Sequence, residues 1–374
     1  MGVVVSLMSV SKKPRLTTTL LTAMSSFSSV ASALLAPIQQ TTVLSTFPTG
    51  GSKVIGTHDG SFHCDEALAI SMLKVLPEFK ESTVVRTRKP DILGQCHIVV
   101  DVGAEYNAET LRFDHHQREF TGVLDPWKTK LSSAGLVYKH YGKEIIKEIL
   151  KSCENVEVTT DFVDICYRKV YEGFMEHIDA IDNGISVSDE PAKYHVSTTL
   201  SNRVGHLNPA WNEPNTPEAF NNGFIQAMTL TGSEFITCVE RLAQQWWPAR
   251  SIVQKAVDQR FTHHSSGSIL ILDSQCPWKD HLFEIEKEQS LNADILYVLY
   301  ADSGGSWRIQ AVPVEPTSFS SRKRLLEPHM GLRDESLSGA VGVPGCIFVH
   351  ASGFIGGHKD KAGALQMAIK SLGC

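Results

Sequence analysis

The chain has 374 residues, of which 42% are hydrophobic and 20% are charged, as expected for a soluble globular protein with room for two domains. Its formal net charge of -6 excludes a global positive field, so a polyanion would have to meet a local basic patch or bound metal ions. None of the eight cysteines forms a C-x-x-C pair. This disfavours a zinc ribbon or a thioredoxin motif and favours reduced thiols in an intracellular enzyme.

Residues 1–50 are predicted to be a transit peptide or a disordered leader. The segment has no Asp or Glu, is rich in Ser and Thr, and has only Lys12, Lys13 and Arg15 as charged side chains. Acid-poor, cationic segments of this kind are typical of organelle import. We predict a mitochondrial address, with a chloroplast address and an untargeted extension as alternatives. The apolar runs of the segment are too short to span a bilayer, so no membrane association is expected.

A first set of candidate metal ligands follows a short strand predicted at 53–57. His58, His63 and Asp65 fall between this strand and an apolar run at 66–73, which is predicted to be a buried helix. Ligands of open α/β sheets bind at the carboxyl ends of strands, where such loops gather. For Asp65, capping of the helix is the alternative, and the two histidines favour metal binding.

Two later strands also end in polar side chains. The run at 97–103 is predicted to be a strand buried on both faces, with Asp101 at its carboxyl end. A carboxylate buried there needs a positive partner, for which a metal ion and a backbone turn are the alternatives. The next strand, predicted at 111–113, ends in Asp114, His115 and His116. Imidazole and carboxylate together are the ligands that manganese and zinc accept.

A long helix is predicted from 161 to 181, and two aspartates stand near its end. Negative charge in the last turn opposes the helix dipole, so a cation is expected nearby. Asp182 is the better ligand candidate, and Asp179 is predicted to be a solvated neighbour. Together with the strand-end residues this makes an inventory for two metal ions, which could activate a water and stabilise a phosphoryl displacement.

The order of the motifs H-x4-H-x-D, V-V-D-V-G, D-H-H and I-D-A-I-D-N-G resembles the DHH-type phosphoesterase superfamily. From about Val54 to the C-terminus, the chain is similar to the melanocyte-proliferating-gene family of eukaryotic DHH-like proteins. These are implicated as 3′→5′ RNA exonucleases in nucleus and mitochondria. The most specific stretches are T-H-D-G-S-F-H-C-D-E-A-L-A, R-F-D-H-H-Q-R-E-F and G-C-I-F-V-H-A-S-G-F-I-G-G-H.

The resemblance implies two divalent metal ions, with Mn²⁺ as the first choice and Mg²⁺ as the alternative. One ion would be held by His58, His63 and Asp101. The other would be held by Asp65, Asp101, His115 and Asp182, so that Asp101 bridges the two. His116 would face the phosphate, and Asp114 would orient His115 through a hydrogen bond. The wider superfamily commonly has H-x3-D-x-D in the first motif, so His63 replaces a carboxylate here and lowers the negative charge.

The C-terminal half is predicted to contain a helical connector at 201–265 and a smaller α/β substrate-binding domain at 266–374. In the connector, Arg203 is predicted to bind phosphate, with a structural ion pair as the alternative. In the last domain, Arg308 would neutralise developing charge. Gly356, Gly357 and His358 resemble the G-G-H substrate loop of DHH-associated domains, read here as a glycine-rich turn that enters a helix. The run Arg322-Lys323-Arg324 is predicted to add positive charge, or else to be a solvated loop.

The sequence therefore predicts an α/β fold in which a DHH-phosphoesterase-like, mostly parallel sheet domain at 53–200 is joined by helices to the substrate domain. The predicted function is that of a metal-dependent phosphodiesterase, a 3′→5′ RNA exonuclease of organelle or nucleus. Its partner would be an RNA 3′ end or a short oligonucleotide. The alternatives are a phosphoesterase acting on small phosphorylated molecules and a non-catalytic metal-binding protein.

Overall fold

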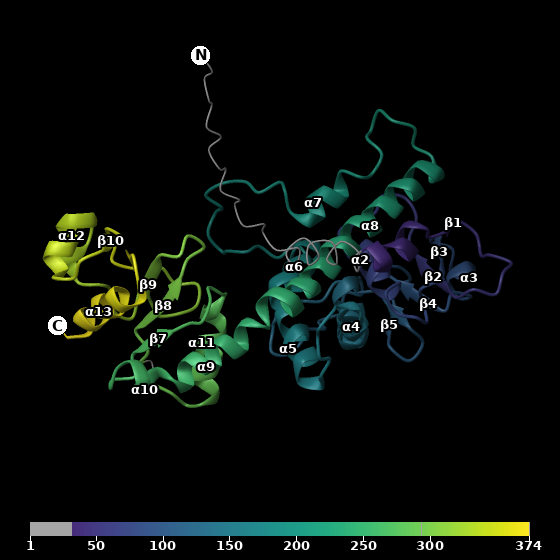
Figure 1. Cartoon of the computed structure of the whole chain (residues 1–374). Helices are drawn as coiled ribbons and strands as arrows, with labels where there is room; N and C mark the ends of the chain where they lie inside the picture. The colour runs from purple at the N-terminus through teal and green to yellow at the C-terminus, as the bar shows by residue number, and fades with distance from the viewer. Residues whose placement is uncertain (1–31, 293, 374) are drawn as a thin grey trace, which may run out of the picture. The chain divides into compact units, whose positions relative to one another are not determined.

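The computed structural model describes residues 32–292 and 294–373. They form two compact units, and the boundary in the chain lies between Ala243 and Gln244 (Figure 1). This boundary falls inside the predicted connector, so the helices up to 241 belong to the first unit. Each unit has its own sheet with helices packed on it, which confirms a mixed α/β protein. Within the described residues, every helix is too short or too polar to cross a membrane.

The first unit is organised around a six-stranded sheet with the order β1-β3-β2-β4-β6-β5. All neighbouring strands are parallel except β5 and β6, so the predicted mostly parallel sheet is confirmed. The strands are β1 (Val43–Leu44), β2 (Val54–Thr57), β3 (Thr83–Arg86), β4 (Ile98–Val100), β5 (Tyr106–Asn107) and β6 (Arg112–Phe113). The three residues of β4 are all buried, as predicted from their apolar, β-branched side chains.

Helix α2 (Cys64–Leu73) lies at the centre of the first unit. All ten of its residues are buried, and it packs against both α4 (Ser133–Ser152) and α8 (Pro217–Arg241). After the two acidic residues of its first turn the helix is almost entirely apolar, and such a helix is stable only when it is buried on all sides. The remaining helices are α3 (Pro90–Leu93), α5 (Thr160–Val170), α6 (Glu176–Asp182) and α7 (Leu200–Gly205).

The single helix predicted at 161–181 is made of three segments. Between α5 and α6, residues Tyr171–Met175 form a π-helical turn, η1. A π turn widens the helix and shifts the direction in which later side chains point. The apolar spacing in the sequence could not reveal this shift, because the buried face continues through the turn.

The first unit begins earlier than predicted. Residues 32–39 are helical, and β1 pairs with β3 at the edge of the sheet, so the disordered-leader alternative is wrong for residues 32–44, while the transit peptide stays a prediction. Residues 1–31 lie outside the described residues. Ile38 is fully buried, and its Cδ1 would lie 2.9 Å from a Cβ placed on Gly232 of α8. The Ser- and Thr-rich composition concealed this single anchoring side chain.

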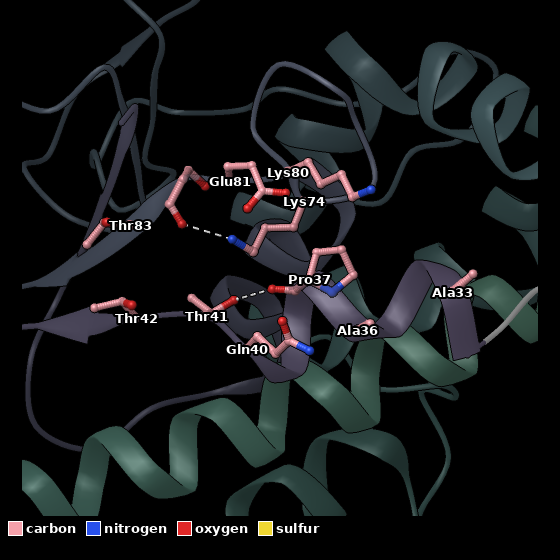
Figure 2. A pocket seen from close by; sticks show the side chains of 11 residues that line it. Ala33, Ala36, Pro37, Gln40, Thr41, Thr42, Lys74, Lys80, Glu81 and Thr83 are labelled. Carbon is pink, nitrogen blue, oxygen red and sulfur yellow. Dashed lines mark hydrogen bonds between the residues drawn. The ribbon is translucent and has the colours of Figure 1, made fainter. Parts of the chain in front are cut away.

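The same segment forms one wall of a cavity of about 360 Å³ beside α2 and β3 (Figure 2). Lys74, which is 2% exposed, lies in its lining and donates from Nζ to the carbonyl of Ser82 at 2.9 Å. Burial lowers the pKa of Lys74 to about 8. The segment at 32–44 therefore covers a buried lysine as well as the edge of the sheet.

The second unit has a five-stranded sheet with the order β10-β11-β9-β8-β7. Only β7 and β8 are parallel. The strands are β7 (Ile269–Ile271), β8 (Tyr297–Ala301), β9 (Trp307–Ala311), β10 (Cys346–Val349) and β11 (Ile355–His358). The helical segments are η2 (Leu242–Trp246), α9 (Ala249–Asp258), α10 (Arg260–His263), α11 (Trp278–Glu288), η3 (Glu327–His329), α12 (Asp334–Val341) and α13 (Lys361–Leu372).

Both faces of this second sheet contribute to a core. Tyr297 and Leu299 belong to the cluster formed with α12 and α13, whereas Val298 and Tyr300 belong to the cluster formed with α9 and α11. This division follows from the alternation of side chains along a strand. The sheet is thus the middle layer of the unit.

The basic run at 322–324 is not a free cationic patch. Arg322 donates from both terminal nitrogens to Glu286 at 2.7 Å, and their side chains are 8% and 7% exposed. Lys323 donates to the carbonyl of Leu372 at 3.0 Å. The solvated-loop alternative is therefore wrong for Arg322, which forms a buried, bidentate ion pair.

We expect Ile38→Ala to lower the free energy of unfolding by about 2–4 kcal/mol, because it removes a fully buried side chain. Its exposed neighbour provides the control, since Gln40→Ala should change stability by less than about 0.5 kcal/mol. A chain that begins at Gly51 should lose at least as much stability as Ile38→Ala, relative to one that begins at Ser32. Urea unfolding measures all four proteins, and equal stability of the two truncated chains would contradict the assignment of 32–44 to the first unit.

Candidate metal centre

The candidate site lies where three neighbouring parallel strands end. In the sheet order β2-β4-β6, the strands are adjacent, so their carboxyl ends meet at one edge. His58 follows β2, Asp101 follows β4, and Asp114 to His116 follow β6. Parallel pairing therefore brings together motifs that are far apart in the chain, as expected for open α/β sheets.

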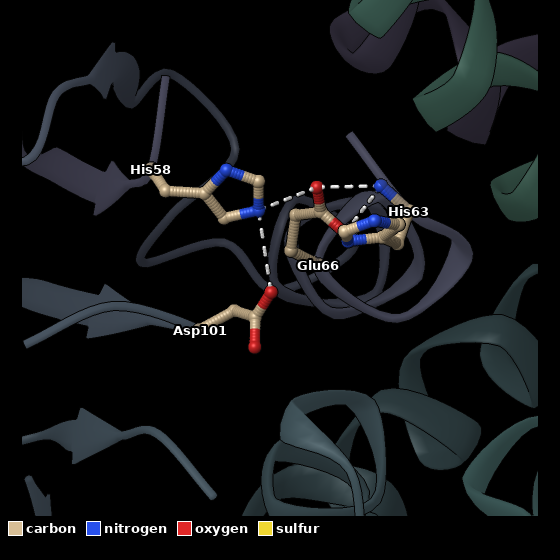
Figure 3. A group of neighbouring side chains, drawn as sticks. All are labelled: His58, His63, Glu66 and Asp101. Atoms are coloured by element: carbon tan, nitrogen blue, oxygen red, sulfur yellow. Dashed lines mark hydrogen bonds and ion pairs between the residues drawn. The ribbon is translucent and has the colours of Figure 1, made fainter. Parts of the chain in front are cut away.

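Three groups of side chains at this edge could hold a cation, because within each group one ligand atom per residue lies within 4.8 Å of the others. The first group is His58, His63, Glu66 and Asp101 (Figure 3). The second is Asp101, His115 and His116. The third is Asp65, His115 and Asp182. All the predicted metal ligands and His116 are thus brought together, and Asp101 and His115 each belong to two groups.

Glu66 was not identified from the sequence. It is fully buried, and its Oε1 lies 3.0 Å from Nε2 of His58. Its carboxylate also accepts hydrogen bonds of 2.8 and 3.0 Å from the backbone nitrogen of His63, which caps α2. A glutamate three residues after a helix cap was the available signal. Asp65 lies inside the first turn, so the capping role considered for it belongs to His63 instead.

Asp101 lies between the two histidines that follow the neighbouring strands. Its Oδ2 lies 3.3 Å from Nε2 of His58, and its Oδ1 lies 3.6 Å from Nε2 of His115. Nε2 of His115 also lies 3.0 Å from Oδ2 of Asp182. These distances place Asp101 at the centre of the cluster, which is the position that the bridging role requires.

The backbone of Asp101 is in the left-handed region, with φ of 57°. Such a conformation is uncommon for residues other than glycine, and it is found often at functional sites. The backbone nitrogen of Asp101 donates to the carbonyl of Phe113 at 3.1 Å, and Ser133 donates from Oγ to its Oδ1 at 3.0 Å. Both bonds hold the strained residue in place.

The histidines of the cluster interact strongly with its carboxylates. Burial alone would lower the pKa of His58, but its interactions with Asp101 and Glu66 raise that pKa to about 10. Burial also acts to lower the pKa of His115, which Asp101 and Asp182 nevertheless raise to about 9. At neutral pH, protons on both rings therefore balance part of the negative charge.

The carboxylates of the cluster differ in the direction in which their pKa is shifted. Burial, followed by the charges of Asp101 and Asp182, raises the pKa of Asp65 well above its usual range. Burial acts to raise the pKa of Asp101 too, but its interactions with His115 and His58 hold it below its usual range. Asp101 is therefore ionised, whereas Asp65 is destabilised as an anion unless a cation is near.

A divalent cation fits this set of donors. The three groups offer four carboxylates, of Asp65, Glu66, Asp101 and Asp182, together with the imidazoles of His58, His63, His115 and His116. Carboxylate oxygens and neutral imidazoles together are ligands that divalent cations such as manganese and zinc accept. Oδ1 of Asp65 is buried and has no hydrogen-bond partner among the described residues. Metal binding would displace the protons of His58 and His115, because neutral imidazole is the ligand form.

Asp114 contacts His116 and not His115, so the predicted orienting contact is wrong. Its Oδ1 lies 2.7 Å from Nδ1 of His116 and accepts from the backbone nitrogen of His116 at 3.1 Å. Its Oδ2 accepts from the backbone nitrogen of Ala104 at 2.7 Å. The chain turns after β6 in such a way that the second histidine, not the first, returns to Asp114.

Asp179 is fully buried, which contradicts the prediction that it is solvated. Its Oδ1 accepts from Ser132, at 2.9 Å from the backbone nitrogen and 2.7 Å from Oγ. Its Oδ2 accepts from the hydroxyl of Tyr171, in the π-helical turn, at 3.0 Å. Burial raises the pKa of Asp179 to about 7, although the hydrogen bonds from Ser132 and Tyr171 oppose this.

These bonds fix the start of α4 beside the metal ligands. Ser132 caps α4 by accepting from the nitrogen of Gly135 at 3.3 Å. The next residue, Ser133, donates from its nitrogen to Oδ2 of Asp65 at 3.3 Å and from Oγ to Asp101. Asp179 therefore holds Ser132, and through it the neighbouring Ser133, against the cluster.

Gly135 is required for this close approach. A Cβ at this position would lie 2.3 Å from Oδ1 of Asp179. No real Cβ makes such a contact, so any larger residue must push α4 and α6 apart.

None of the predicted substrate-binding residues belongs to the three metal-ligand groups. Arg203, in α7, pairs with Glu234 at 3.0 Å on the surface, which is the structural alternative. Arg308, in β9, pairs with Asp302 and lies over the ring of Phe348. These contacts leave substrate binding by Arg203 and Arg308 as a prediction.

The predicted glycine-rich turn is confirmed only at its start: residues 351–354 form a turn, whereas Ile355–His358, with Gly356 and Gly357, form strand β11. A Cβ on Gly357 would lie 2.8 Å from Nη1 of Arg308, so Gly357 allows a neighbouring strand's side chain to pass. Gly356 pairs with Ile309 in the same ladder. His358 is 1% exposed; its Nε2 donates to the carbonyl of Pro344 at 2.8 Å, and its Nδ1 accepts from the nitrogen of Asp360 at 3.0 Å. Its ring thus has a structural role, and contact with a substrate stays a prediction.

A cleft of about 290 Å³ opens beside the metal-ligand groups within the first unit. His63, Asp101, His116 and Asp182 line it, and the side chain of His116 is 61% exposed. Phe62, Ile178 and Ile181 contribute apolar surface to the same cleft. A small molecule that enters it therefore meets both candidate ligands and apolar side chains.

The fold and this cluster define a mixed α/β protein with a candidate metal centre at the carboxyl ends of parallel strands. The family model described as MYG1_exonuc, Uncharacterised protein family (UPF0160), matches residues 54–372, and the chain belongs to this family.

Relatives from distant organisms match over most of the chain. It is 50% identical over 327 residues to the MYG1 exonuclease of Mus musculus, with 85% of this chain and 84% of the relative covered. It is 49% identical to the MYG1 exonuclease of Homo sapiens, with 85% of each chain covered. The MYG1 protein of Saccharomyces cerevisiae is 46% identical, with 86% and 96% covered. No solved structure matches the chain.

We expect Asp101→Asn to weaken the binding of Mn²⁺ by at least about tenfold, since loss of a supporting residue alone typically costs that much. Asp59→Asn is the matched control, because Asp59 is in the same loop as His58, is 58% exposed at its side chain and pairs with Arg88. Calorimetric titration of the metal-free chain measures both. Equal affinities in the two variants would contradict the central place of Asp101.

We expect Gly135→Ala to lower the free energy of unfolding by about 1–3 kcal/mol, because the added methyl group overlaps Asp179. A Cβ added to Gly173, in the π-helical turn, would have nothing within 4 Å, so Gly173→Ala should be neutral or slightly stabilising. Urea unfolding with chelator present compares them. If Gly135→Ala proved as stable as Gly173→Ala, the close packing of α4 on Asp179 would be disproved.

Proposed function

We propose that this protein is a metal-dependent phosphodiesterase that removes nucleotides from the 3′ end of RNA, with two divalent ions, Mn²⁺ first among them. One observation carries the proposal: three groups of candidate ligands lie at the edge of a parallel sheet, and Asp101 and His115 each link two of these groups. The name exonuclease of the relatives from Mus musculus and Homo sapiens supports nucleic acid as the substrate. RNA and the 3′ polarity rest on the family resemblance.

Two ions bound there would supply Lewis-acid stabilisation of the phosphoryl charge and lower the pKa of the attacking water. The chain's own residues would orient the reaction. Asp114 holds Nδ1 of His116, so Nε2 is the nitrogen left to meet substrate in the cleft. In its protonated form, His116 would donate to the leaving oxygen as a general acid. Ser133 would keep Asp101 in position.

The shape of the cleft supports removal of one nucleotide at a time. Its volume of about 290 Å³ is at the lower end for small-molecule sites. The ligand residues on one side would hold the scissile phosphate. Phe62, Ile178 and Ile181 offer the apolar contact that a sugar or base requires.

A thiol mechanism has no support at this site. Cys64 also lines the cleft, but burial raises its pKa to about 12, although a hydrogen bond with Ser201 lowers it in part. The thiolate is the nucleophilic form of cysteine, and at neutral pH it is not populated here. The nucleophile is therefore expected to be water.

A phosphoesterase that acts on short oligonucleotides or small phosphate esters is the second candidate. The cations predicted to grip a longer RNA are paired: Arg203 with Glu234, Arg308 with Asp302, and Arg322 with Glu286. These ion pairs offset part of the positive charge that the three arginines could present to a chain of phosphates. This favours substrates that are recognised mainly at their ends.

The cellular location is proposed on the leader alone. We propose import into mitochondria, with processing that ends before Ser32, because residues 32–44 are part of the folded first unit. The nucleus, which the resemblance adds, is the second location.

The proposed activity predicts a ladder of products shortened from the 3′ end when a short 5′-labelled RNA is incubated with the chain from Ser32 onwards and Mn²⁺. Chelator, Asp101→Asn and His115→Ala should each abolish the ladder, because each removes cations or their ligands. Asp59→Asn should retain it. Cleavage that persists in chelator would exclude a metal-dependent reaction.

A separate variant tests the role of His116. We expect His116→Ala to lower kcat by about 100-fold while the KM for RNA changes little, as for loss of a general acid. Single-turnover rates at saturating RNA measure this. If metal binds the wild type but neither RNA nor short oligonucleotides are cleaved, a non-catalytic metal-binding protein replaces the proposal.

A further inference from the structure

The second unit contains a groove of about 290 Å³ at the start of α11. Three of its lining residues are aromatic and come from different segments: Trp246 from η2, Trp278 from α11 and Tyr300 from β8. All lie between Gln244 and Cys374, so the groove belongs to the second unit alone. The metal-ligand groups are all in the first unit.

The aromatic wall is rigid. The imidazole of His281, which is fully buried, lies 4.0 Å from the ring of Trp246, centroid to centroid. Its Nε2 also donates to the carbonyl of Trp246 at 2.8 Å. Trp278 and Tyr300 are 4% and 7% exposed, so their positions are set by the core. Of the three rings only that of Trp246 is partly exposed, and a flat ring can stack on it with little loss of side-chain entropy.

One edge of the groove presents a fixed amide. The hydroxyl of Tyr300 donates to Oε1 of Gln310 at 2.9 Å. This bond orients the side chain, so its NH₂ group is the part available to a ligand in the groove. An amide donor beside an aromatic wall is the arrangement by which proteins read the edges of unstacked bases.

The charges of the groove disfavour a simple anion as its ligand. Lys279 and Asp280 both line it, so their charges balance. A bare phosphate would be attracted by one and repelled by the other. A neutral planar ring with donors and acceptors on its edge matches both the aromatic wall and the mixed polar rim.

We propose that this groove binds a nucleobase, supplied either by a free nucleotide or by an RNA strand. None of its lining residues belongs to the metal-ligand groups, and the proposal does not require that the metal centre be catalytic. The base would stack on Trp246 and accept a hydrogen bond from Gln310.

Indole nitrogen NMR of the full chain tests this with a signal from each of the two wall tryptophans, Trp246 and Trp278. Chelator is present throughout, and the resonances of Trp246 and Trp278 are assigned by single Trp→Phe substitutions. Uridine and adenosine 5′-monophosphates are titrated, with ribose 5-phosphate as the ligand that lacks a base. We expect saturable shifts of Trp246 and Trp278 with the nucleotides and none with ribose 5-phosphate. Trp211, which is 97% exposed in the first unit, should not shift.

Substitution of Gln310 distinguishes nucleotide binding in this groove from binding at another surface. We expect Gln310→Leu to weaken the nucleotide affinity by about tenfold, as for a lost base-edge hydrogen bond. Unchanged indole resonances in the ligand-free spectrum verify its fold. Equal affinity in wild type and Gln310→Leu, shifts with ribose 5-phosphate, or an absence of shifts at Trp246 and Trp278 would each overturn the proposal.

A hexauridylate titration then identifies the source of the base. Shifts with both the mononucleotide and the hexamer indicate a site open to free nucleotides, and shifts with the hexamer alone indicate a site for the RNA strand. The RNA-cleavage assay is independent of these spectra. If the resonances of Trp246 and Trp278 do not shift but RNA is cleaved, only the nucleobase site is rejected. If they shift but RNA is not cleaved, only the proposed exonuclease activity is rejected.

Discussion

Mutual repulsion among buried carboxylates is the constraint on which the first unit depends. Asp65, Glu66 and Asp101 are each almost completely buried, and Asp182 lies beside them. Such groups separate or take up protons unless the backbone and an opposite charge hold them together. Here the backbone does so through the strand order β2-β4-β6 and through the central helix α2. The hydrogen bonds from Ser133 to Asp65 and Asp101 add a second support from α4.

The sequence predicted the candidate ligands correctly where they stand at the end of a predicted strand. His58, Asp101 and His115 stand at the ends of apolar strands, so their meeting could be predicted from parallel pairing. Glu66 was missed because a glutamate in the first turn of a helix is ordinary as a capping residue. Asp179 was misjudged because its partners, Ser132 and Tyr171, come from outside its own helical turn. Spacing along one helix contains no information about such contacts.

The second unit shows the opposite case. There a motif predicted a substrate-binding turn, but its residues are in a strand and make structural contacts. Gly356 and Gly357 were interpreted as a turn, yet they are in a strand where a missing Cβ makes room for Arg308 and Phe348. His358 joins two backbone segments instead of facing solvent. Glycine serves close packing as readily as it serves turns, and only the neighbouring strand distinguishes the two. A basic residue can mislead in the same way. Arg322 was expected to add positive charge for a substrate, whereas its side chain forms a buried ion pair with Glu286.

The early start of the first unit has a consequence for the edge of its sheet. Strand β1 covers β3, and it precedes the family match, which begins at residue 54. Without β1, the backbone groups on one side of β3 would be an open template for another chain, and open edges promote aggregation. A strand of two residues is itself too short to recruit a partner efficiently. Residues 32–44 thus cover a strand edge that would otherwise be open, and an N-terminus trimmed to the family boundary would lose this cover.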